Sequence, residues 1–523
     1  MLARFLVAAL AGVALALAYE PVAVAYLMPL SLAAYALCTR EVRSRAGLAV
    51  GLVFGAAFYF PHIYWMSPSI GLPAWLALAF VETLFYGALG AVSPVLQRLR
   101  SWPAWLAAAW VAMETIRATW PFSGMPWGRL GFGVVDTPLA PALAYVGVNG
   151  VSLLVALMGF LLARVVVSSR GDERRFSLAA VVLVTAAAAA PTFVPWTLAT
   201  TGRTTVAAVQ GNVPGRGDDV LLDVEQLTQN HVDATVALAE RVSSGESPRP
   251  DFVVWPENST ARDPFEDASI NAGIRQAAQA IGVPVLVGAI VDAGEQHVLN
   301  EGIVWDPVTG AGDRYAKRHP VAYGEYIPLR SVLPDSLVNS GQLARIPRDM
   351  LSGSRTTPLS IAGVKVADSI CFDIAYDDGI KVQVDRGAQL LTVQTSNASF
   401  IFTDQVEQQF AITRARAIES GRYVVVAATN GVSGVIAPDG TVVDRTQRRT
   451  QDVVLETVDL KSGVTPGLEV GEVLRATTPW IAVVGVLWGI LVRRRASHAD
   501  GQPSRAPQAA EPKTPRHDQD LRV

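Results

Sequence analysis

Long apolar blocks occupy most of the first 195 residues, and they limit the possible folds more than any other feature of the chain. A transmembrane helix needs about 20 mostly apolar residues to cross a bilayer. Blocks close to this length predict membrane spans at 4–19, 22–38, 46–62, 72–96, 103–120, 143–167, 176–195 and 477–492. The first block also resembles a signal peptide, because Arg4 precedes it and residues 16–18 resemble a cleavage site. An apolar content of 50% agrees with a membrane protein.

Arginine residues fall in alternate loops between these blocks. Positively charged loops are retained on the cytoplasmic side of a membrane. The loops after the second, fourth, sixth and last blocks carry Arg40, Arg43, Arg45, Arg98, Arg100, Arg170, Arg174, Arg175 and Arg493 to Arg495. The intervening short loops carry only Arg117 and Arg129. This alternation predicts a cytoplasmic N-terminus and an extracytoplasmic segment at 196–476.

Net charge and cysteine content exclude several other classes of protein. The net charge of -3 gives no basic excess of the kind that nucleic-acid binding requires. Only two cysteines occur, Cys38 at the end of an apolar block and Cys371 in a distant region of mixed polarity, so neither a disulfide framework nor a cysteine metal site is predicted. The tail at 496–523 has almost no large apolar residues, which predicts a disordered cytoplasmic extension.

The segment at 196–476 alternates short β-branched runs with amphipathic helical patterns, as is typical of an α/β sandwich. We expect strands at 205–209, 252–255, 283–290, 365–369, 389–395 and 423–428, and helices at 220–243, 268–281 and 405–420. Asp439-Gly440 predicts a hairpin turn. The predicted domains are a membrane domain with seven spans at 1–195, an extracytoplasmic catalytic domain at 196–476, a transmembrane span at 477–495 and the tail at 496–523.

Three reactive residues stand at or near strand ends, where α/β folds normally assemble a site. Glu257 follows the apolar run at 252–255, Lys317 lies in Tyr-Ala-Lys-Arg-His, and Cys371 ends the run at 366–370. Each residue alone also fits a structural role, as a solvated acid, a surface cation or a small buried side chain.

Together, the three residues predict covalent catalysis. A thiol attacks as the thiolate, which needs a base and a nearby positive charge. Glu257 supplies the base, and Lys317 supplies the charge and stabilises an oxyanion. His319, next to the lysine, leaves a Cys-His dyad as the weaker interpretation.

The order Trp-Pro-Glu, Tyr-Ala-Lys-Arg-His and Cys-Phe-Asp resembles the Glu-Lys-Cys triad of the nitrilase superfamily, whose domain is an αββα sandwich. Seven spans before that domain and one after it resemble the apolipoprotein N-acyltransferases, the membrane-bound branch of the superfamily. Gln-Gly-Asn at 210–212 and Tyr-Gly-Glu-Tyr-Ile-Pro at 323–328 are also similar to the family. The resemblance covers about residues 1–495.

The chain departs from the family pattern at three places outside the triad. The stretch at 396–401 lacks the usual aspartate, small residue, tryptophan, phenylalanine and glycine. Phe372 and Asp373 stand where tyrosine and glutamate are common, and the tryptophan that often follows Gln-Gly-Asn is absent. These departures concern the acyl-donor preference and the shape of the lipid-facing loops.

The resemblance implies transfer of a fatty acyl chain from a membrane phospholipid to the α-amino group of the N-terminal diacylglyceryl-cysteine of apolipoproteins, through a thioester on Cys371. It implies a multi-pass protein of the bacterial cytoplasmic membrane with its C-terminal tail in the cytoplasm, and lipoproteins as partners. We expect no cofactor, since no metal, nucleotide or flavin motif occurs. Glu325, Tyr323, Asp373 and Asn397 are expected to support the site or bind substrate.

Five aromatic residues of the predicted extracytoplasmic loops suit the membrane interface, where aromatic rings are favoured. They are Trp65, Trp120, Phe122, Trp127 and Phe132. Two other functions stay open: a membrane-tethered amidase or hydrolase, in which water resolves the thioester, and a receptor or transporter with a nitrilase-like domain. The spans contain few ionisable residues, chiefly Glu82 and Glu114, which argues against transport.

Overall fold

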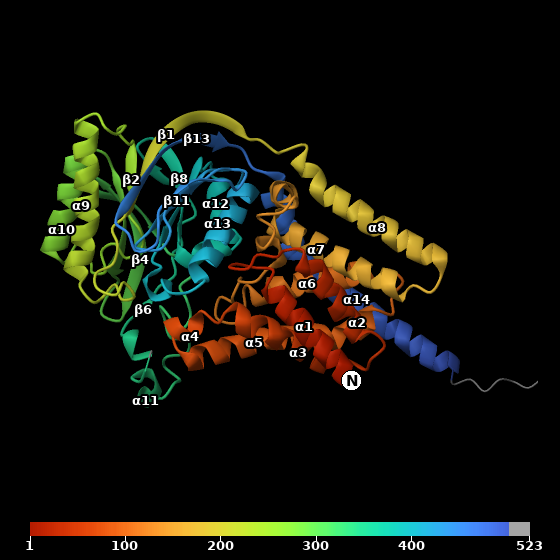
Figure 1. Cartoon of the computed structure of the whole chain (residues 1–523). Helices are drawn as coiled ribbons and strands as arrows, with labels where there is room; N and C mark the ends of the chain where they lie inside the picture. The colour runs from red at the N-terminus through yellow and green to blue at the C-terminus, as the bar shows by residue number, and fades with distance from the viewer. Residues whose placement is uncertain (342, 501–523) are drawn as a thin grey trace, which may run out of the picture.

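The computed structural model describes residues 1–341 and 343–500, which form a helical part and an α/β part (Figure 1). The helical part contains α1 (Leu2–Ala16), α2 (Leu27–Thr39), α3 (Ser44–His62), α4 (Met66–Ser69), α5 (Leu72–Leu96), α6 (Trp102–Arg117), α7 (Leu143–Val167), α8 (Gly171–Ala189) and α14 (Pro466–Asp500). Each predicted span corresponds to one of these helices. Among the described residues, five helices are long and apolar enough to cross a membrane: 44–62, 72–96, 140–167, 171–192 and 466–495.

Several predicted span boundaries are wrong. The second helix begins at Leu27 and not at 22, because residues 20–26 form turns that begin with Glu20-Pro21. The helix predicted at 103–120 ends at Arg117, whose guanidinium turns back to the carbonyls of Met125 and Trp127. The helix predicted at 176–195 is displaced to 171–189. Its α-helical bonding stops before Pro191, which has no N–H to donate.

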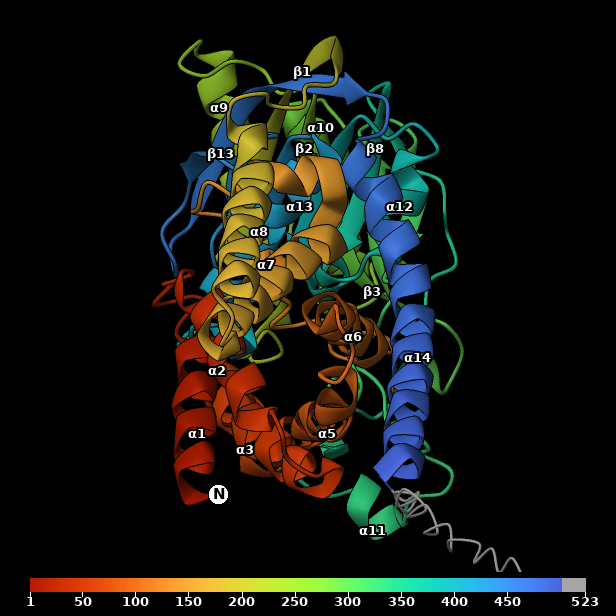
Figure 2. The same cartoon turned by 90° about the vertical axis from the view of Figure 1, so that its right-hand side faces the viewer.

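The last helix, α14, is longer at both ends than the predicted span. Its polar first turns stay helical because they pack on α7, where Gly467 lies directly against the backbone of Leu143. Figure 2 shows α14 running along the side of the helical part, where it also contacts α6. Residues 496–500, predicted as tail, belong to this helix, and the rest of the predicted tail lies outside the described residues.

Small residues bring α3 and α5 into close contact. A Cβ on Gly47 would lie 2.2 Å from the carbonyl oxygen of Gly90, and one on Gly51 would lie 2.1 Å from that of Tyr86. Close backbone approach at small residues is the usual way in which helices associate in membranes. Glycines, which would destabilise a helix of a soluble protein, therefore form the contact surface between α3 and α5.

The α/β part contains two sheets whose strands are β1 (Ala199–Gln210), β2 (Phe252–Val254), β3 (Val285–Asp292), β4 (His297–Asp306), β5 (Gly310–Ala316), β6 (Asp349–Met350), β7 (Leu359–Ile361), β8 (Val364–Ile370), β9 (Leu390–Thr395), β10 (Val424–Ala428), β11 (Gly434–Ile436), β12 (Val442–Arg445) and β13 (Asp452–Ser462). In the described part of the chain, one sheet has the order β13-β1-β2-β3-β4-β5 with β6 beside β4, and the other has the order β12-β11-β10-β9-β8-β7. The predicted hairpin at Asp439-Gly440 joins β11 to β12.

Helices cover the outer face of each sheet, so the α/β part has four layers (Figure 1). Helices α9 (Val224–Ser243) and α10 (Ala268–Ile281) pack on the first sheet, and α12 (Asp378–Val384) and α13 (Gln405–Ser420) lie on the second. The strands β1, β2 and β3 are parallel neighbours, as are β8, β9 and β10. The carboxyl ends of parallel strands lie at one edge of a sheet, which brings together the residues that follow β2, β8 and β9.

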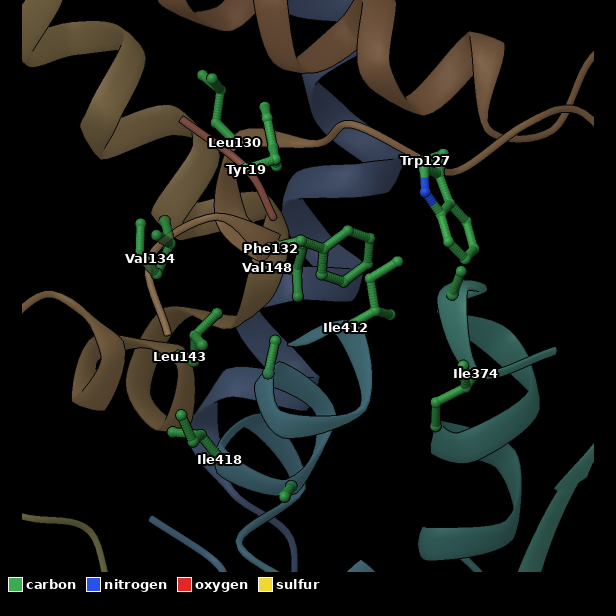
Figure 3. Close-up of a cluster of buried hydrophobic side chains, with 14 of the residues drawn as sticks. Tyr19, Trp127, Leu130, Phe132, Val134, Leu143, Val148, Ile374, Ile412 and Ile418 are labelled. Carbon is green, nitrogen blue, oxygen red and sulfur yellow. The ribbon is translucent and has the colours of Figure 1, made fainter. Parts of the chain in front are cut away.

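A buried apolar cluster joins the helical part to the α/β part (Figure 3). Its labelled members come from the turn after α1, from α7 and the loop before it, from α13 and from the turn after β8. The labelled side chains are Tyr19, Trp127, Leu130, Phe132, Val134, Leu143, Val148, Ile374, Ile412 and Ile418. Because α13 touches both this cluster and the turn after β8, the helical part helps to fix that turn in place.

A buried ion-pair network lies beside this cluster. Arg416 on α13 donates to the carbonyl oxygens of Ile374 at 2.9 Å and Ala375 at 2.7 Å, both in the turn after β8. Its guanidinium also pairs with Glu419, which accepts a hydrogen bond of 2.8 Å from the backbone N–H of Val148 on α7. The network connects a membrane-type helix to the turn that begins with the candidate nucleophile.

Candidate active site

The candidate nucleophile, Cys371, follows β8 directly and begins a short helical turn, Cys371–Ala375. Its backbone φ is 55°, in the left-handed region that residues other than glycine rarely adopt. Such strain occurs at functional sites, where a sharp turn after a strand presents a nucleophile. The side chain is buried, with 5% of its surface exposed.

Glu257 follows β2 and is held by three hydrogen bonds. Its Oε1 accepts from Asn300 Nδ2 at 2.7 Å and from Lys317 Nζ at 3.2 Å, and its Oε2 accepts from the backbone N–H of Ser396 at 2.7 Å. The residue is almost completely buried. These donors fix the orientation of the carboxylate.

Lys317 follows β5 and is completely buried between two carboxylates. Its Nζ lies 3.2 Å from Glu257 Oε1 and 2.6 Å from Glu325 Oε1. Burial lowers the pKa of Lys317, but the charges of Glu257 and Glu325 outweigh it and hold that pKa well above its usual value. The side chain is therefore a fixed cation.

The charges of these groups act on Cys371, so all four side chains share one buried site. Burial and the Glu257 carboxylate raise the pKa of the Cys371 thiol, and the opposing effect of Lys317 is smaller. The resting group is therefore a thiol, and it needs a base before it can attack. Glu325 completes the set: its Oε2 accepts from the backbone N–H of Val321 at 2.8 Å, and burial raises the pKa of Glu325.

Asp373 holds the segment after Lys317 against the nucleophile turn. It accepts hydrogen bonds from Tyr315 Oη at 3.1 Å and from the backbone N–H groups of Arg318 at 2.9 Å and His319 at 2.8 Å. Burial alone would raise the pKa of the Asp373 carboxyl. The hydrogen bond and charge of His319 outweigh that effect, so this pKa lies below its usual value. These hydrogen bonds fit the supporting role expected for this buried carboxylate.

His319 is occupied by two carboxylates. Its ring nitrogens lie 3.2 Å from Asp373 Oδ1 and 3.3 Å from Asp378 Oδ1, and its ring stacks on Tyr376 with centroids 3.9 Å apart. Burial alone would lower the pKa of the His319 imidazole. The hydrogen bonds and charges of Asp373 and Asp378 have a larger, opposite effect, so this pKa is raised to about 9. The His319 imidazole is therefore a cation at neutral pH and a poor base, so this arrangement does not favour a Cys-His dyad.

The two other expected site residues are Tyr323 and Asn397. Tyr323 is 39% exposed and contacts Phe122 of the helical part edge to face, with centroids 6.0 Å apart. Asn397 is buried, and its side chain donates to Gln405 Oε1 at 3.4 Å. Tyr323 thus lies where the two parts meet, and Asn397 anchors the loop that begins with Ser396.

The interfacial role expected for Trp65, Trp127 and Phe132 is wrong, because all three are buried. The indole N–H groups of Trp65 and Trp127 both donate to Gln408 Oε1, at 3.0 and 2.7 Å. Trp127 stacks on Phe372, the neighbour of the nucleophile, with centroids 4.7 Å apart. Of the five aromatic residues, Trp120 and Phe122 remain exposed.

Sequence reasoning missed three contributors: Asn300, the backbone N–H of Ser396, and Gln408 on α13. Asn300 lies in β4, a strand that was not predicted, and its backbone carbonyl also accepts from the N–H of Lys317 at 2.8 Å. The signal for it was an amide side chain, next to Glu301, in the largely apolar run at 298–305.

Two protein families match separate parts of this chain. Residues 11–161 match the apolipoprotein N-acyltransferase N-terminal domain family, and residues 205–464 match the carbon-nitrogen hydrolase family. An apolipoprotein N-acyltransferase of Mycolicibacterium smegmatis is 36% identical over 477 residues, covering 87% of this chain and 79% of that protein. One from Ralstonia nicotianae is 30% identical over 526 residues, covering 94% of each.

Among solved structures, the chain is similar to a carbon-nitrogen hydrolase from Helicobacter pylori G27. The identity is 16% and the TM-score 0.37, and the match covers 57% of this chain and 97% of that one.

Proposed function

The chain belongs to the apolipoprotein N-acyltransferase family of the nitrilase superfamily, and we propose that it transfers a fatty acyl chain from a membrane phospholipid to the α-amino group of the N-terminal diacylglyceryl-cysteine of apolipoproteins. The observation that carries the proposal is the buried group of Cys371, Glu257 and Lys317. A thiol, a fixed carboxylate and a fixed cation are the groups that two-step acyl transfer needs.

In the first step Glu257 accepts the proton of the Cys371 thiol, and the thiolate attacks the ester carbonyl carbon of the phospholipid. The carbonyl electron pair moves to oxygen, where Lys317 stabilises the negative charge. The first N–H groups of a helical turn have no acceptor within that turn, and we propose those of the Cys371–Ala375 turn as further donors. The carbon–oxygen bond then breaks, and the lysophospholipid alkoxide takes the proton from Glu257.

In the second step the α-amine of the lipoprotein attacks the thioester carbonyl. Glu257 accepts a proton from the attacking amine, the carbon–sulfur bond breaks, and the same proton returns to the departing thiolate. The amide product leaves, and the enzyme regains its starting protonation state. Glu325, the second carboxylate on Lys317, keeps the lysine charged while the protonation of Glu257 changes.

The position of the site supports a membrane substrate. Phe372 packs against Trp65 and Trp127 of the helical part, so the residue next to the nucleophile touches the part of the chain with long apolar helices. This contact places the nucleophile beside the part of the chain that we propose to lie in the membrane, as a substrate anchored in the bilayer requires. An amidase acting on a soluble substrate needs no such contact.

We further propose the domain arrangement and sidedness given by the arginine pattern: spans within 1–195 and at 477–495, with 196–476 outside the cytoplasm. A reporter fused near residue 300 is expected to read extracytoplasmic, and one fused after Arg495 is expected to read cytoplasmic, because arginine-rich loops are retained inside. Paired enzyme reporters that are active on opposite sides of the membrane measure both positions. The reverse pattern would contradict the orientation.

The proposed reaction is tested by mass spectrometry of a lipoprotein N-terminus from cells with and without the protein. With the protein, the N-terminal cysteine is expected to carry an amide-linked acyl chain, and without it the α-amine is expected to be free. The control is a lipoprotein whose modified cysteine is replaced by serine. Purified protein that releases free fatty acid from phospholipid and never acylates an amine would instead identify a hydrolase.

A further inference from the structure

Two buried oxygen atoms face each other beneath the active site, with no hydrogen-bond donor for either among the described residues. They are Oδ2 of Asp368 on β8 and Oε1 of Gln394 on β9. Both lie 2.4 Å from the point that a Cβ on Gly302 of β4 would occupy. The two atoms therefore approach the same spot between the two sheets, where glycine alone leaves room for them.

The other polar atom of each side chain already has a hydrogen-bond partner. Asp368 Oδ1 accepts from Thr392 Oγ1 at 2.7 Å, and Gln394 Nε2 donates to the backbone carbonyl of Trp255 at 2.6 Å. Turning the Gln394 amide over would place its oxygen against that carbonyl oxygen. The amide orientation is therefore fixed, and two acceptors face one another unless one of them carries a proton.

We propose that Asp368 is a positioning residue that keeps its carboxyl proton and donates it to Gln394 Oε1, forming a cross-link between the two sheets beneath the active site. A protonated carboxyl supplies the one donor that this pair lacks, and the hydrogen bond satisfies both buried oxygens. An ionised carboxylate would leave an unpaired charge and an unpaired amide oxygen in a buried site.

The cross-link joins the elements that deliver the catalytic groups. Asp368 lies three residues before Cys371 on β8. Gln394 lies two residues before Ser396, whose N–H binds Glu257. Trp255, the acceptor for Gln394, lies two residues before Glu257 itself. A proton on Asp368 therefore sets the spacing between the nucleophile and its base, although Asp368 touches neither.

The surroundings of Asp368 favour the protonated form. Burial raises the pKa of Asp368 to about 8, and the negative charge of Asp373 adds to this, while the hydrogen bonds from Thr392 and the backbone of Ser369 oppose it. The titratable groups that face it are Asp373 and, from β5, the buried Tyr315. The other packed elements present amides: Gln383 of α12, which binds the Asp368 backbone, and Gln394 of β9.

The test compares Asp368→Asn with Asp368→Leu in the full chain in detergent. Asn places an N–H₂ donor where the acid O–H is and keeps an acceptor for Thr392, so acyl-enzyme formation is expected to stay within about twofold of wild type. Leu has no donor, and the rate is expected to fall about tenfold or more, since small misplacements of catalytic groups cost up to about 10²-fold. An Asn variant as slow as the Leu variant would overturn the proposal.

A second readout does not depend on activity. A folded-state pKa near 8 and a lower unfolded-state value mean that the proton's contribution to stability is complete at low pH and is lost as pH rises towards about 8. The melting temperature of wild type relative to Asp368→Asn is thus expected to fall between pH 5 and pH 8. Asp233→Asn, at an exposed acid on α9, is the control for removing one acidic group. A difference that stays constant with pH would show an ionised Asp368 and overturn the proposal.

The positioning role rests on the proposed acyl transfer, but the two can fail separately. If wild type forms no thioester with phospholipid, the proposed function fails, and the pH dependence of melting still decides the state of Asp368. If wild type forms the thioester and the melting difference is flat, only the inference about Asp368 fails.

Discussion

Cys371→Ala is expected to abolish acyl transfer while the protein remains folded and inserted in the membrane. The thiol forms the proposed covalent bond to the acyl group, and no other group at the site can replace it in that role. Loss of the nucleophile from another covalent enzyme costs on the order of 10⁶ in kcat. Alanine is small and apolar, so it fits the buried position of Cys371, where it removes only the hydrogen bond with Thr395.

The chain contains a matched control for this variant. Cys38 is the second cysteine, it is also buried, and it lies on α2 of the helical part. Cys38→Ala is expected to keep wild-type acyl transfer and wild-type thioester labelling. Intact-protein mass spectrometry after incubation with phospholipid measures the added acyl mass in both variants. An acyl adduct that persists in Cys371→Ala and disappears in Cys38→Ala would refute the proposed mechanism.

Glu257→Gln and Lys317→Met are each expected to suppress acyl-enzyme formation strongly. Gln cannot accept the thiol proton, and burial already keeps the Cys371 thiol protonated at rest. Met removes the charge that lowers the thiol pKa and stabilises the oxyanion, a loss of about 10²–10³-fold for a single donor. Lys317→Arg is expected to recover little, because a planar guanidinium does not fit the place of a compact ammonium.

Removal of Lys317 alone also leaves two buried carboxylates without their cation, which threatens the fold. Lys317→Met combined with Glu325→Gln removes one of those charges, so it is expected to restore the melting temperature without restoring activity. The assay is accumulation of the acyl-enzyme from phospholipid without an amine acceptor. Wild-type accumulation in both Glu257→Gln and Lys317→Met would make these residues structural and the assigned triad wrong.

Much of the architecture was readable from local patterns. Apolar length predicted each long helix of the helical part, and the β-branched runs predicted β1, β2, β3, β8, β9 and β10. Cys371 at the end of β8 and Glu257 just after β2 were identified because a reactive residue after a buried strand is visible in a single stretch of sequence. The strands β4, β5, β6, β7 and β13 were not predicted. Their partly polar sequences, such as Asp452–Ser462 with its mixed burial, gain stability from pairing with neighbouring strands and show little preference alone.

The sequence by itself predicted the long helices and the parallel strands, and it pointed to the three residues of the proposed triad, because periodicity, apolar length and the triad motifs act within short stretches of chain. Only the tertiary structure decided what surrounds those residues. Asn300 and the Ser396 N–H reach Glu257 from 43 and 139 residues away, and Gln408 reaches Trp65 from 343 residues away. The same holds for the meeting of Asp368 with Gln394. Such contacts depend on strand register and on how sheets and helices pack. Burial then sets the charge of each titratable group. Neither the contacts nor the charges can be predicted from a residue's own neighbours in the sequence.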